Sequence, residues 1–443
     1  MNKRPTVTLC MIVKDEEHII RDCLSSIAPY IDRYDISDTG STDRTKEIIK
    51  EFFEEKGIPG KVYDDPWLGF GKSRTQSLRN CKGKADYAWV IDADDFVEGD
   101  FKYPENFGQH DGYSLNIFRG TFNWWRNQIF KVESDWEYIG VIHEYADSPT
   151  QRAKNNGNLL IDRIGGNYRI HARTMGKRTQ EFKDDEQAKY LKDAEILVGC
   201  LTNPEDPNYE PKNARYLFYA GQSFFDGGNY EEAYKWYQKR AEFGGWEEEQ
   251  WYSVYRMAQC LLSDEMREKE PDWWQKAQDH LLQAWNIRPF RAEPLLTLAR
   301  THRLNQNPNL AYMFARAGVN IKFPENDILF LSHNVYDWEL LDELAAVAHL
   351  MGDWHLGYQA SSKLIEEGKF PEEHRQRIQN NFNSYQQYML NQQQQQQKQV
   401  EEAKQREEME KASREKHRQE QVALKKKAKR DLDKRNKRKS RSR

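Results

Sequence analysis

Short apolar runs alternate with segments of helical spacing along the N-terminal part of the chain. Residues 6–13 form an unbroken apolar and β-branched run, which is typical of a strand buried on both faces. Residues 16–27 then show apolar positions at helical intervals. The same alternation continues with expected strands and helices at residues 34–37, 44–56, 61–63, 71–80 and 87–91. This order predicts βαβ units built around a mostly parallel sheet.

Polar clusters follow the first, second and fourth of these strands. They are KDEE at residues 14–17, DTGSTD at residues 38–43 and DADD at residues 92–95. Because ligands of open α/β sheets bind beyond the carboxyl ends of the strands, the clusters are expected to meet at one edge. Within the second cluster, Ser41 or Thr42 can cap the helix that follows. The strand before it carries Asp35 and Ser37, which would lie in a buried layer unless other groups pair with them.

The pattern changes twice farther along the chain. Short strands rich in aromatic and glycine residues are expected from 112 to 170, as the second half of the same domain. After residue 181 the pattern is helical, and residues 214–243 have the features of a tetratricopeptide-like hairpin with a Gly-Asn turn. Looser copies follow at residues 252–289, 292–324 and 338–371. We therefore predict an α/β domain at residues 1–180, helical repeats at 181–390 and a tail at 391–443.

The tail is rich in glutamine and charged residues and has almost no apolar stripe. We expect it to be a solvated single helix or a disordered segment. Twelve Lys or Arg against two Asp lie from residue 425 to the end, whereas the whole chain has a net charge of −4. Nucleic acid, an anionic membrane surface and an acidic protein are candidate partners for this basic end. Because it lacks interleaved aromatic residues for base stacking, we expect no specific nucleic acid and only weak contact with polyanions or a membrane surface.

Length and composition narrow the class of protein. At 443 residues, with 38% hydrophobic and 13% aromatic residues, the chain is long enough for two domains and too aromatic for its body to be disordered. No stretch approaches the roughly 20 apolar residues that span a bilayer, and the apolar start meets charged residues at once, unlike a signal peptide. Five scattered cysteines without CxxC spacing indicate a reducing compartment. We expect a cytoplasmic protein, with peripheral contact at the membrane surface as a variant of that expectation.

The acidic run at residues 92–95 carries the first chemical signal. Asp92 and Asp94 form an Asp-X-Asp pattern at the end of an expected strand, and Mg²⁺ and Mn²⁺ prefer such oxygen ligands. A divalent cation held there would neutralise the diphosphate that leaves when a sugar is transferred from a nucleotide-sugar donor. An isolated acidic run of this kind is more often a solvated or helix-capping loop, so its meaning depends on its context.

That context resembles glycosyltransferase family 2, which has the GT-A fold, a Rossmann-like mixed sheet of nucleotide-diphospho-sugar transferases. The likeness is greatest to bacterial and viral members that carry tetratricopeptide-like repeats after the transferase domain. It covers roughly residues 5–371, and the runs that carry it lie at residues 9–17, 38–43, 70–75, 92–95, 140–144, 216–220, 244–248 and 288–294. The resemblance implies an α/β GT-A domain followed by an all-α tetratricopeptide-like repeat domain.

The resemblance also implies which residues bind the donor. Lys14, Asp15 and Glu16 match the loop that borders the nucleoside. Asp38 matches the acid that hydrogen-bonds the uracil edge in members that use uridine donors, although a plain Asx turn would explain the same residue. Arg74 matches a basic residue that faces the nucleotide, and an ordinary charge on a surface helix is its alternative interpretation.

A metal site for Mn²⁺ or Mg²⁺ is implied in the same way. Asp92 matches the acid near the ribose and the metal, Asp94 matches the direct metal ligand, and Asp95 supports them. His171 lies where many members have a late histidine ligand, and His143 is a weaker candidate. A lone histidine is more often packed or solvent-facing, so both assignments depend on the position of the ring.

An inverting transferase needs a base that takes the proton from the attacking hydroxyl, on the face opposite the leaving diphosphate. Family members often show a His-Glu pair at this point, which makes Glu144 the expected catalytic base in preference to His143. Glu137 or Asp135 could serve instead, and a structural salt bridge is the alternative role for Glu144.

Together these features predict a metal-dependent inverting glycosyltransferase. It would move a sugar from a nucleotide-sugar donor, with a UDP-sugar expected, to a hydroxyl on a glycan, lipid or protein acceptor, while the repeats could bind a protein partner. Two alternatives stay open: a repeat-based binding scaffold whose transferase domain has lost activity, and a polyanion-binding protein dominated by its basic tail. The enzyme is favoured because drift would usually remove one of the carboxylates of Asp38, Asp92, Asp94 and Glu144.

Overall fold

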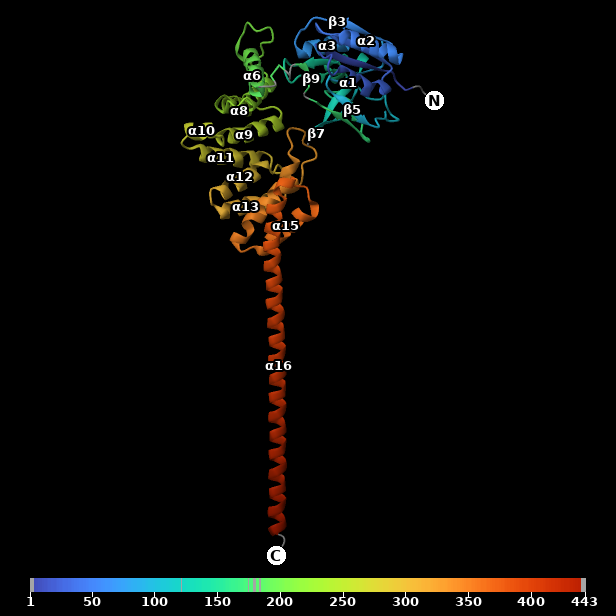
Figure 1. Cartoon of the computed structure of the whole chain (residues 1–443). Helices are drawn as coiled ribbons and strands as arrows, with labels where there is room; N and C mark the ends of the chain where they lie inside the picture. The colour runs from blue at the N-terminus through green and yellow to red at the C-terminus, as the bar shows by residue number, and fades with distance from the viewer. Residues whose placement is uncertain (1–3, 121, 174, 178–180, 183–184, 440–443) are drawn as a thin grey trace. The chain divides into compact units, whose positions relative to one another are not determined.

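The computed structural model describes residues 4–120, 122–173, 175–177, 181–182 and 185–439 of the chain (Figure 1). The chain divides into two compact units. The first comprises residues 1–287 with 325–330, and the second comprises residues 288–324 with 331–443. The first unit holds an α/β domain followed by packed helices, and the second consists of helices and their connections.

Four parallel strands form one half of the sheet in the first unit. They are β1 (Val7–Val13), β2 (Arg33–Asp38), β3 (Gly60–Asp64) and β4 (Tyr87–Val90). β1 lies between β2 and β4, and β3 pairs with the other side of β2. The connecting helices are α1 (Ile20–Ile27), α2 (Thr45–Lys56) and α3 (Phe70–Asn80). The predicted βαβ order is confirmed, and Leu9 and Ile36 are fully enclosed as their apolar runs require.

Later strands complete a nine-stranded sheet among the described residues, in the order β3-β2-β1-β4-β7-β6-β11-β5 with β10 paired to β6. These strands are β5 (Phe96–Gly99), β6 (Gly112–Arg119), β7 (Phe122–Lys131), β10 (Ile161–Arg163) and β11 (Tyr168–His171). β7 runs antiparallel to both β4 and β6, which makes the sheet mixed. A separate hairpin and a short helix lie between β7 and β10: β8 (Glu137–Ile139), β9 (Tyr145–Asp147) and α4 (Pro149–Lys154). This mixed α/β domain confirms the predicted fold class.

The two polar residues expected inside the second strand are both paired. Asp35 is fully enclosed, and its carboxylate accepts hydrogen bonds from Thr8 Oγ1 (2.8 Å), Arg33 Nε (2.8 Å) and Tyr63 Oη (2.9 Å). Ser37 Oγ accepts a hydrogen bond from Asn80 Nδ2 of α3 at 3.2 Å. The buried layer therefore tolerates these groups because neighbouring strands and helices satisfy them.

Replacing Asp35 by alanine should lower the free energy of unfolding by about 3 kcal/mol, because the buried Thr8 hydroxyl, the partly buried Tyr63 hydroxyl and the Arg33 guanidinium lose their shared acceptor. Urea titration of the full chain, followed by tryptophan fluorescence, measures this loss. The matched control is Asp64→Ala, which removes a carboxylate that is 80% exposed in a surface ion pair. That control should cost less than about 1 kcal/mol, and equal losses in the two variants would contradict the structural role of Asp35.

Successive packed helices make up the rest of the first unit. They are α6 (Glu186–Thr202), α7 (Ala214–Asp226), α8 (Tyr230–Phe243), α9 (Glu247–Leu261), α10 (Asp264–Lys269) and α11 (Trp273–Ile287). Gly221 of α7 faces Tyr237 of α8 so closely that an added Cβ would lie 2.9 Å from the ring. The turn between these helices contains Gly228 at a φ of 77°, and the Asn229 side chain caps α8. The predicted tetratricopeptide-like hairpin is therefore present.

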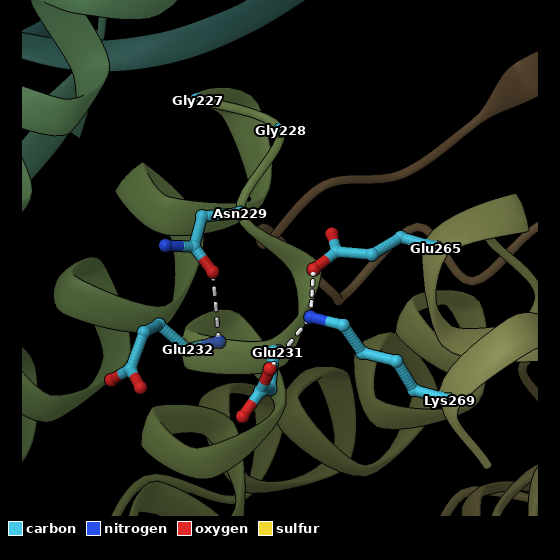
Figure 2. Close-up of a pocket in the computed structure, with 7 residues that line it drawn as sticks. All are labelled: Gly227, Gly228, Asn229, Glu231, Glu232, Glu265 and Lys269. Atoms are coloured by element: carbon cyan, nitrogen blue, oxygen red, sulfur yellow. Dashed lines mark hydrogen bonds and ion pairs between the residues drawn. The ribbon is translucent and has the colours of Figure 1, made fainter.

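The same turn lines a cavity of about 400 Å³, shown in Figure 2. Lys269 of α10 donates to Glu231 (2.8 Å) and to Glu265 (2.8 Å) at its rim. The lysine neutralises part of this acidic rim, and the residues that line the cavity include none of the predicted site residues. The cavity is therefore not part of the predicted site.

The second unit contains the later repeats and the tail. Its helices are α12 (Glu293–Leu304), α13 (Pro308–Gly318), α14 (Leu340–Val347), α15 (Trp354–Glu367) and α16 (Arg375–Lys439). In the first turns of α16 the side chains of Ile378 and Tyr385 are buried. From residue 393 to 434 the side chains of this helix are exposed. The tail thus adopts the helical alternative as far as residue 439. Over the described residues, no helix is both long and apolar enough to cross a membrane.

Candidate active site

Hydrogen bonds tie the loop after β1 to the loop after β2. The Asp15 amide donates to Ser41 Oγ (3.0 Å), and Asp15 Oδ1 accepts from the Thr42 amide (2.7 Å). Ser41 and Thr42 therefore hold the neighbouring loop, and the prediction that one of them caps α2 is wrong. At the start of that helix it is Asp43 Oδ1 that accepts from the Thr45 amide, at 2.9 Å. The first two polar clusters meet at one sheet edge, as expected.

Asp38 ends β2 and is 1% exposed. Its Oδ1 accepts hydrogen bonds from the amides of Gly40 (3.0 Å) and Ser41 (2.9 Å), so the Asx turn considered from the sequence is present. Its Oδ2 is buried and has no hydrogen-bond partner among the described residues. A buried acceptor left unpaired costs on the order of 1–3 kcal/mol, which an N–H group of a ligand would offset.

Two arginines join the acidic run after β4 to other elements. Arg74 of α3 donates to Asp92 Oδ1 (2.6 Å) and to Glu144 Oε1 (2.7 Å). Arg126 of β7 donates to Asp95 Oδ2 (2.8 Å) and to Asp92 Oδ2 (3.5 Å). The side chains of Arg74 and Glu144 are only 14% and 12% exposed. The fold thus brings the predicted base and the acidic run to a single arginine.

These contacts shift the pKa values of Asp92 and Asp95, the first and last carboxylates of the acidic run, in opposite directions. Burial alone would raise the pKa of Asp92, but the charges and hydrogen bonds of Arg74 and Arg126 outweigh it and lower that pKa to about 2. Burial and then the charge of Asp92 raise the pKa of Asp95 to about 7, against the opposing charge of Arg126. The two arginines therefore favour the ionised form of Asp92, whereas burial and the charge of Asp92 favour the protonated form of Asp95.

Asp94 and Glu16 both accept hydrogen bonds from the backbone at residues 175–177. Asp94 Oδ2 accepts from two successive amides (3.1 and 3.0 Å), and Glu16 Oε1 accepts from the Lys177 amide (3.2 Å). A Cβ added to Gly176 would lie 3.2 Å from Glu16 Oε1 and 3.4 Å from Asp94 Oδ2, so the carboxylates converge. Burial, with a contribution from the charge of Asp94, raises the pKa of Glu16 to about 7. Its Oε2 is buried without a hydrogen-bond partner among the described residues.

Asp94 and Glu16 could hold a divalent cation if ligands from outside the protein completed its coordination. Within the described ranges, no group of three or more His, Cys, Asp or Glu side chains is arranged to hold a metal by itself. Mg²⁺ is commonly bound by one or two carboxylates together with substrate phosphates rather than by an all-protein cage. The convergence of Glu16 and Asp94, with one buried oxygen unpaired, leaves negative charge that such a cation would stabilise.

The two predicted histidines lie among other side chains. His171 Nε2 is 2.7 Å from Glu98 Oε2, and its ring stacks on Phe96 with centroids 4.6 Å apart. This placement follows from the antiparallel pairing of β11 with β5. His143 stacks on Tyr219 of α7 with centroids 4.0 Å apart. A metal-ligand role for His171 stays a prediction, which the contacts of its ring do not support.

Among the described residues, three other candidates form no hydrogen bond or ion pair with the acidic run at residues 92–95. Lys14 is exposed just after β1. Asp135, an alternative base, forms an exposed ion pair with Lys82. Glu137, the other alternative, lies in β8 and is partly buried. Of the three acids considered as the base, Glu144 is the one that Arg74 joins to the acidic run.

Arg126 is a site residue for which the sequence suggests no role. Its hydrogen bond to Asp95 depends on the insertion of β7 beside β4, which local patterns do not reveal. The one hint of Arg126 in the sequence is that it directly follows Trp124 and Trp125. In the structure, these two tryptophans lie in a strand and are each 36% exposed.

Comparison with known proteins identifies the family of the N-terminal segment. Residues 8–109 match the model of glycosyl transferase family 2, so this segment is a glycosyltransferase domain of that family. A TPR repeat-containing protein of Synechococcus elongatus is 36% identical over 222 residues, which cover 45% of this chain and 53% of that protein. The chain thus spans about half the length of this curated relative.

Solved structures resemble the chain only distantly. S. aureus TarS 1–349 in complex with UDP-GlcNAc aligns with 63% of this chain and 92% of its own, at 15% identity and a TM-score of 0.35. MamA aligns with 44% of this chain and 92% of its own, at 15% identity and a TM-score of 0.29. A thermophilic TPR protein of Thermus thermophilus aligns with 46% and 94%, at 13% identity and a TM-score of 0.30. These scores are too low to carry a conclusion about function.

Proposed function

Given that residues 8–109 form a family 2 glycosyltransferase domain, we propose that the chain is an active, metal-dependent inverting glycosyltransferase that uses a UDP-sugar. The observation that carries the proposal is the placement of Asp92 and Glu144 on one arginine, Arg74, beside the converging carboxylates of Asp94 and Glu16. A mere binding scaffold would gain nothing from these crowded acids, because their mutual repulsion and burial destabilise the fold.

Asp38 supports a donor whose base offers an N–H group. Uracil carries one imide N–H, and Asp38 Oδ2 is a buried acceptor that lacks a hydrogen-bond partner among the described residues. A hydrogen bond between them would satisfy the carboxylate and fix the base at the end of β2. The loops tied together through Asp15 and Ser41 would then border the nucleoside.

We expect Mn²⁺ or Mg²⁺ to be held by Asp94, with Asp92 and Glu16 beside it. The bound cation would neutralise the diphosphate as it leaves. Arg74 and Arg126 would support metal binding indirectly. They keep the pKa of Asp92 at about 2 in spite of its burial, so this carboxylate stays negative at neutral pH. His171 would join this site only if its ring left Glu98.

Glu144 would act as the general base. The acceptor oxygen attacks the anomeric carbon, the bond from that carbon to the diphosphate oxygen breaks, and the hydroxyl proton passes to Glu144. Arg74 holds Glu144 and Asp92 at once in the structure. An incoming diphosphate would compete with both carboxylates for this arginine, and the release of Glu144 would leave its Oε1 able to take the proton.

The acceptor hydroxyl is expected on a glycan, lipid or protein. The helical repeats are the expected surface for a protein partner, and the basic end of α16 is the expected surface for weak contact with polyanions or membranes. The cytoplasm remains the expected compartment. All candidate site residues precede residue 178.

A panel of nucleotide sugars tests the donor site. Thermal unfolding of the full chain would be followed with UDP- and GDP-sugars, each with and without Mn²⁺. We expect a UDP-sugar at about 100 times its Kd to stabilise the protein by about 2.7 kcal/mol, and only when Mn²⁺ is present. Asp38→Ala should weaken this stabilisation, because the base loses its acceptor. The absence of any metal-dependent stabilisation by either class of donor would contradict the proposal.

A further inference from the structure

Helix α7 contacts the segment that carries Glu144. Arg215 donates to the His143 carbonyl through Nε (3.1 Å) and Nη2 (2.8 Å). The Tyr219 ring stacks on the His143 ring, with centroids 4.0 Å apart and planes 13° apart. The Arg215 guanidinium also lies 4.9 Å over the ring of Tyr145. The residues on both sides of Glu144 are therefore held by one helix of the repeats.

The held segment has a backbone that needs support from its surroundings. His143 has a φ of 54°, and Gly140 has a φ of 111°. A left-handed φ in a non-glycine residue is unfavourable and persists where contacts enforce it. Helix α3 confines one side of the segment, since a Cβ added to Gly71 would lie 2.4 Å from the Gly140 carbonyl oxygen. Helix α7 confines the other side.

Arg215 is itself fixed from within the repeats. Its Nη1 lies 3.8 Å from Glu249 Oε1. Glu249 Oε2 in turn accepts hydrogen bonds from Arg240 Nε (3.1 Å) and Nη2 (3.0 Å). The Arg240 side chain is fully buried and also donates to the Gly244 carbonyl (2.6 Å). A buried arginine with several partners is a rigid anchor, so α8 and α9 help to set the position of Arg215.

We propose that Arg215 is a positioning residue for the transferase, which makes the first repeat hairpin a structural part of the acceptor side of the active site. This inference rests on the proposed function, because it takes Glu144 as the base. The His143 carbonyl belongs to the peptide that joins His143 to Glu144. By holding that carbonyl, Arg215 fixes the peptide plane and with it the direction in which the Glu144 side chain leaves the backbone.

Kinetics of two Arg215 variants and one control variant of the full chain test this role. Donor turnover is measured as release of nucleoside diphosphate. Arg215→Ala should lower kcat by about 10-fold or more, since a misplacement of about 1 Å can cost as much as 10²-fold. KM for the UDP-sugar and the Mn²⁺-dependent thermal shift should not change, because Asp38 and Asp94 are untouched. Arg215→Lys retains one donor toward the His143 carbonyl and should recover part of the lost kcat.

Hydrogen–deuterium exchange gives a readout that does not depend on activity. Residues 140–146 should exchange faster in Arg215→Ala than in the wild type. The matched control is Arg267→Ala on α10, which also removes an exposed ion pair, with Asp264 (3.6 Å), and a cation–π contact, with Trp273 (4.8 Å). This control should keep the wild-type kcat and the wild-type exchange at residues 140–146.

The inference is overturned if Arg215→Ala keeps the wild-type kcat, or if its kcat falls without faster exchange at residues 140–146. A loss of the donor-dependent thermal shift would also overturn it, because Arg215 would then act on donor binding. Failure of the proposed function has a different signature, which is a wild-type chain that releases no nucleoside diphosphate from any donor. The exchange measurement would still decide in that case whether α7 holds the segment.

Discussion

Replacing Glu144 by glutamine should lower kcat by about 10²- to 10⁴-fold, while donor binding stays at least as strong as in the wild type because the neutral amide competes less with the diphosphate for Arg74. Glutamine keeps the size of the side chain and an oxygen that can accept the hydrogen bond from Arg74 Nε, which is 2.7 Å long in the native protein. It cannot take a proton from the acceptor. The expected variant therefore shows the full Mn²⁺-dependent thermal shift with a UDP-sugar and almost no release of UDP.

Glu137→Gln is the matched control for this variant. Glu137 lies in β8, in the same hairpin region as Glu144, and it is the alternative base that the fold leaves partly buried. The control should turn the donor over at the wild-type rate. If it lost activity while Glu144→Gln retained it, the base would be Glu137, and the role proposed for Arg74 would also be wrong.

The second large effect is expected at Asp94. Asp94→Asn should remove the dependence on metal from both donor binding and turnover, because the neutral amide is a poor ligand for Mn²⁺ or Mg²⁺. The loss of several kcal/mol of charge stabilisation in the transition state corresponds to about 10²- to 10⁴-fold in kcat. The amide oxygen can still accept from the backbone amides of residues 175 and 176, so the local fold should survive.

Asp22→Ala controls for the removal of a nearby negative charge. Asp22 is 69% exposed and pairs with Arg173 Nη1 (3.3 Å). The Nε of the same arginine donates to the Asp94 carbonyl. Metal titrations followed by the thermal shift should give the wild-type curve for Asp22→Ala and a flat response for Asp94→Asn. A wild-type titration curve in Asp94→Asn would show that the cation is held elsewhere.

Local pattern predicts the strands and helices of the first half closely, because burial and periodicity coincide there. The expected strand at residues 6–13 is β1 (Val7–Val13), which is buried almost throughout. The first helix differs: it begins at Ile20 rather than near residue 16. The Glu16 amide instead donates to Thr45 Oγ1 at the start of α2, and the Glu17 amide donates to Asp43 Oδ2 in the loop before that helix. No periodicity records such contacts.

The acids of the site follow from motif and position, whereas the residues that pair with them do not. Asp38 ends β2 and Asp94 follows β4, so a sequence reader can place both at the sheet edge. Arg126 reaches Asp95 because an antiparallel strand lies beside β4, and Arg215 reaches the segment at Glu144 from the repeats. Both contacts arise from tertiary packing between distant segments, for which a single sequence carries no signal.

The central proposal, that the acidic edge of the sheet is a metal-dependent donor site, is tested most directly by UDP release. Wild-type chain and Asp94→Asn would be incubated with a UDP-sugar, once with Mn²⁺ and once with excess chelator, and the UDP formed would be quantified over time. We predict steady release from the wild type with Mn²⁺ and background levels in the other three samples. Release that is equal with and without the chelator, or equal in the two proteins, would contradict the proposal.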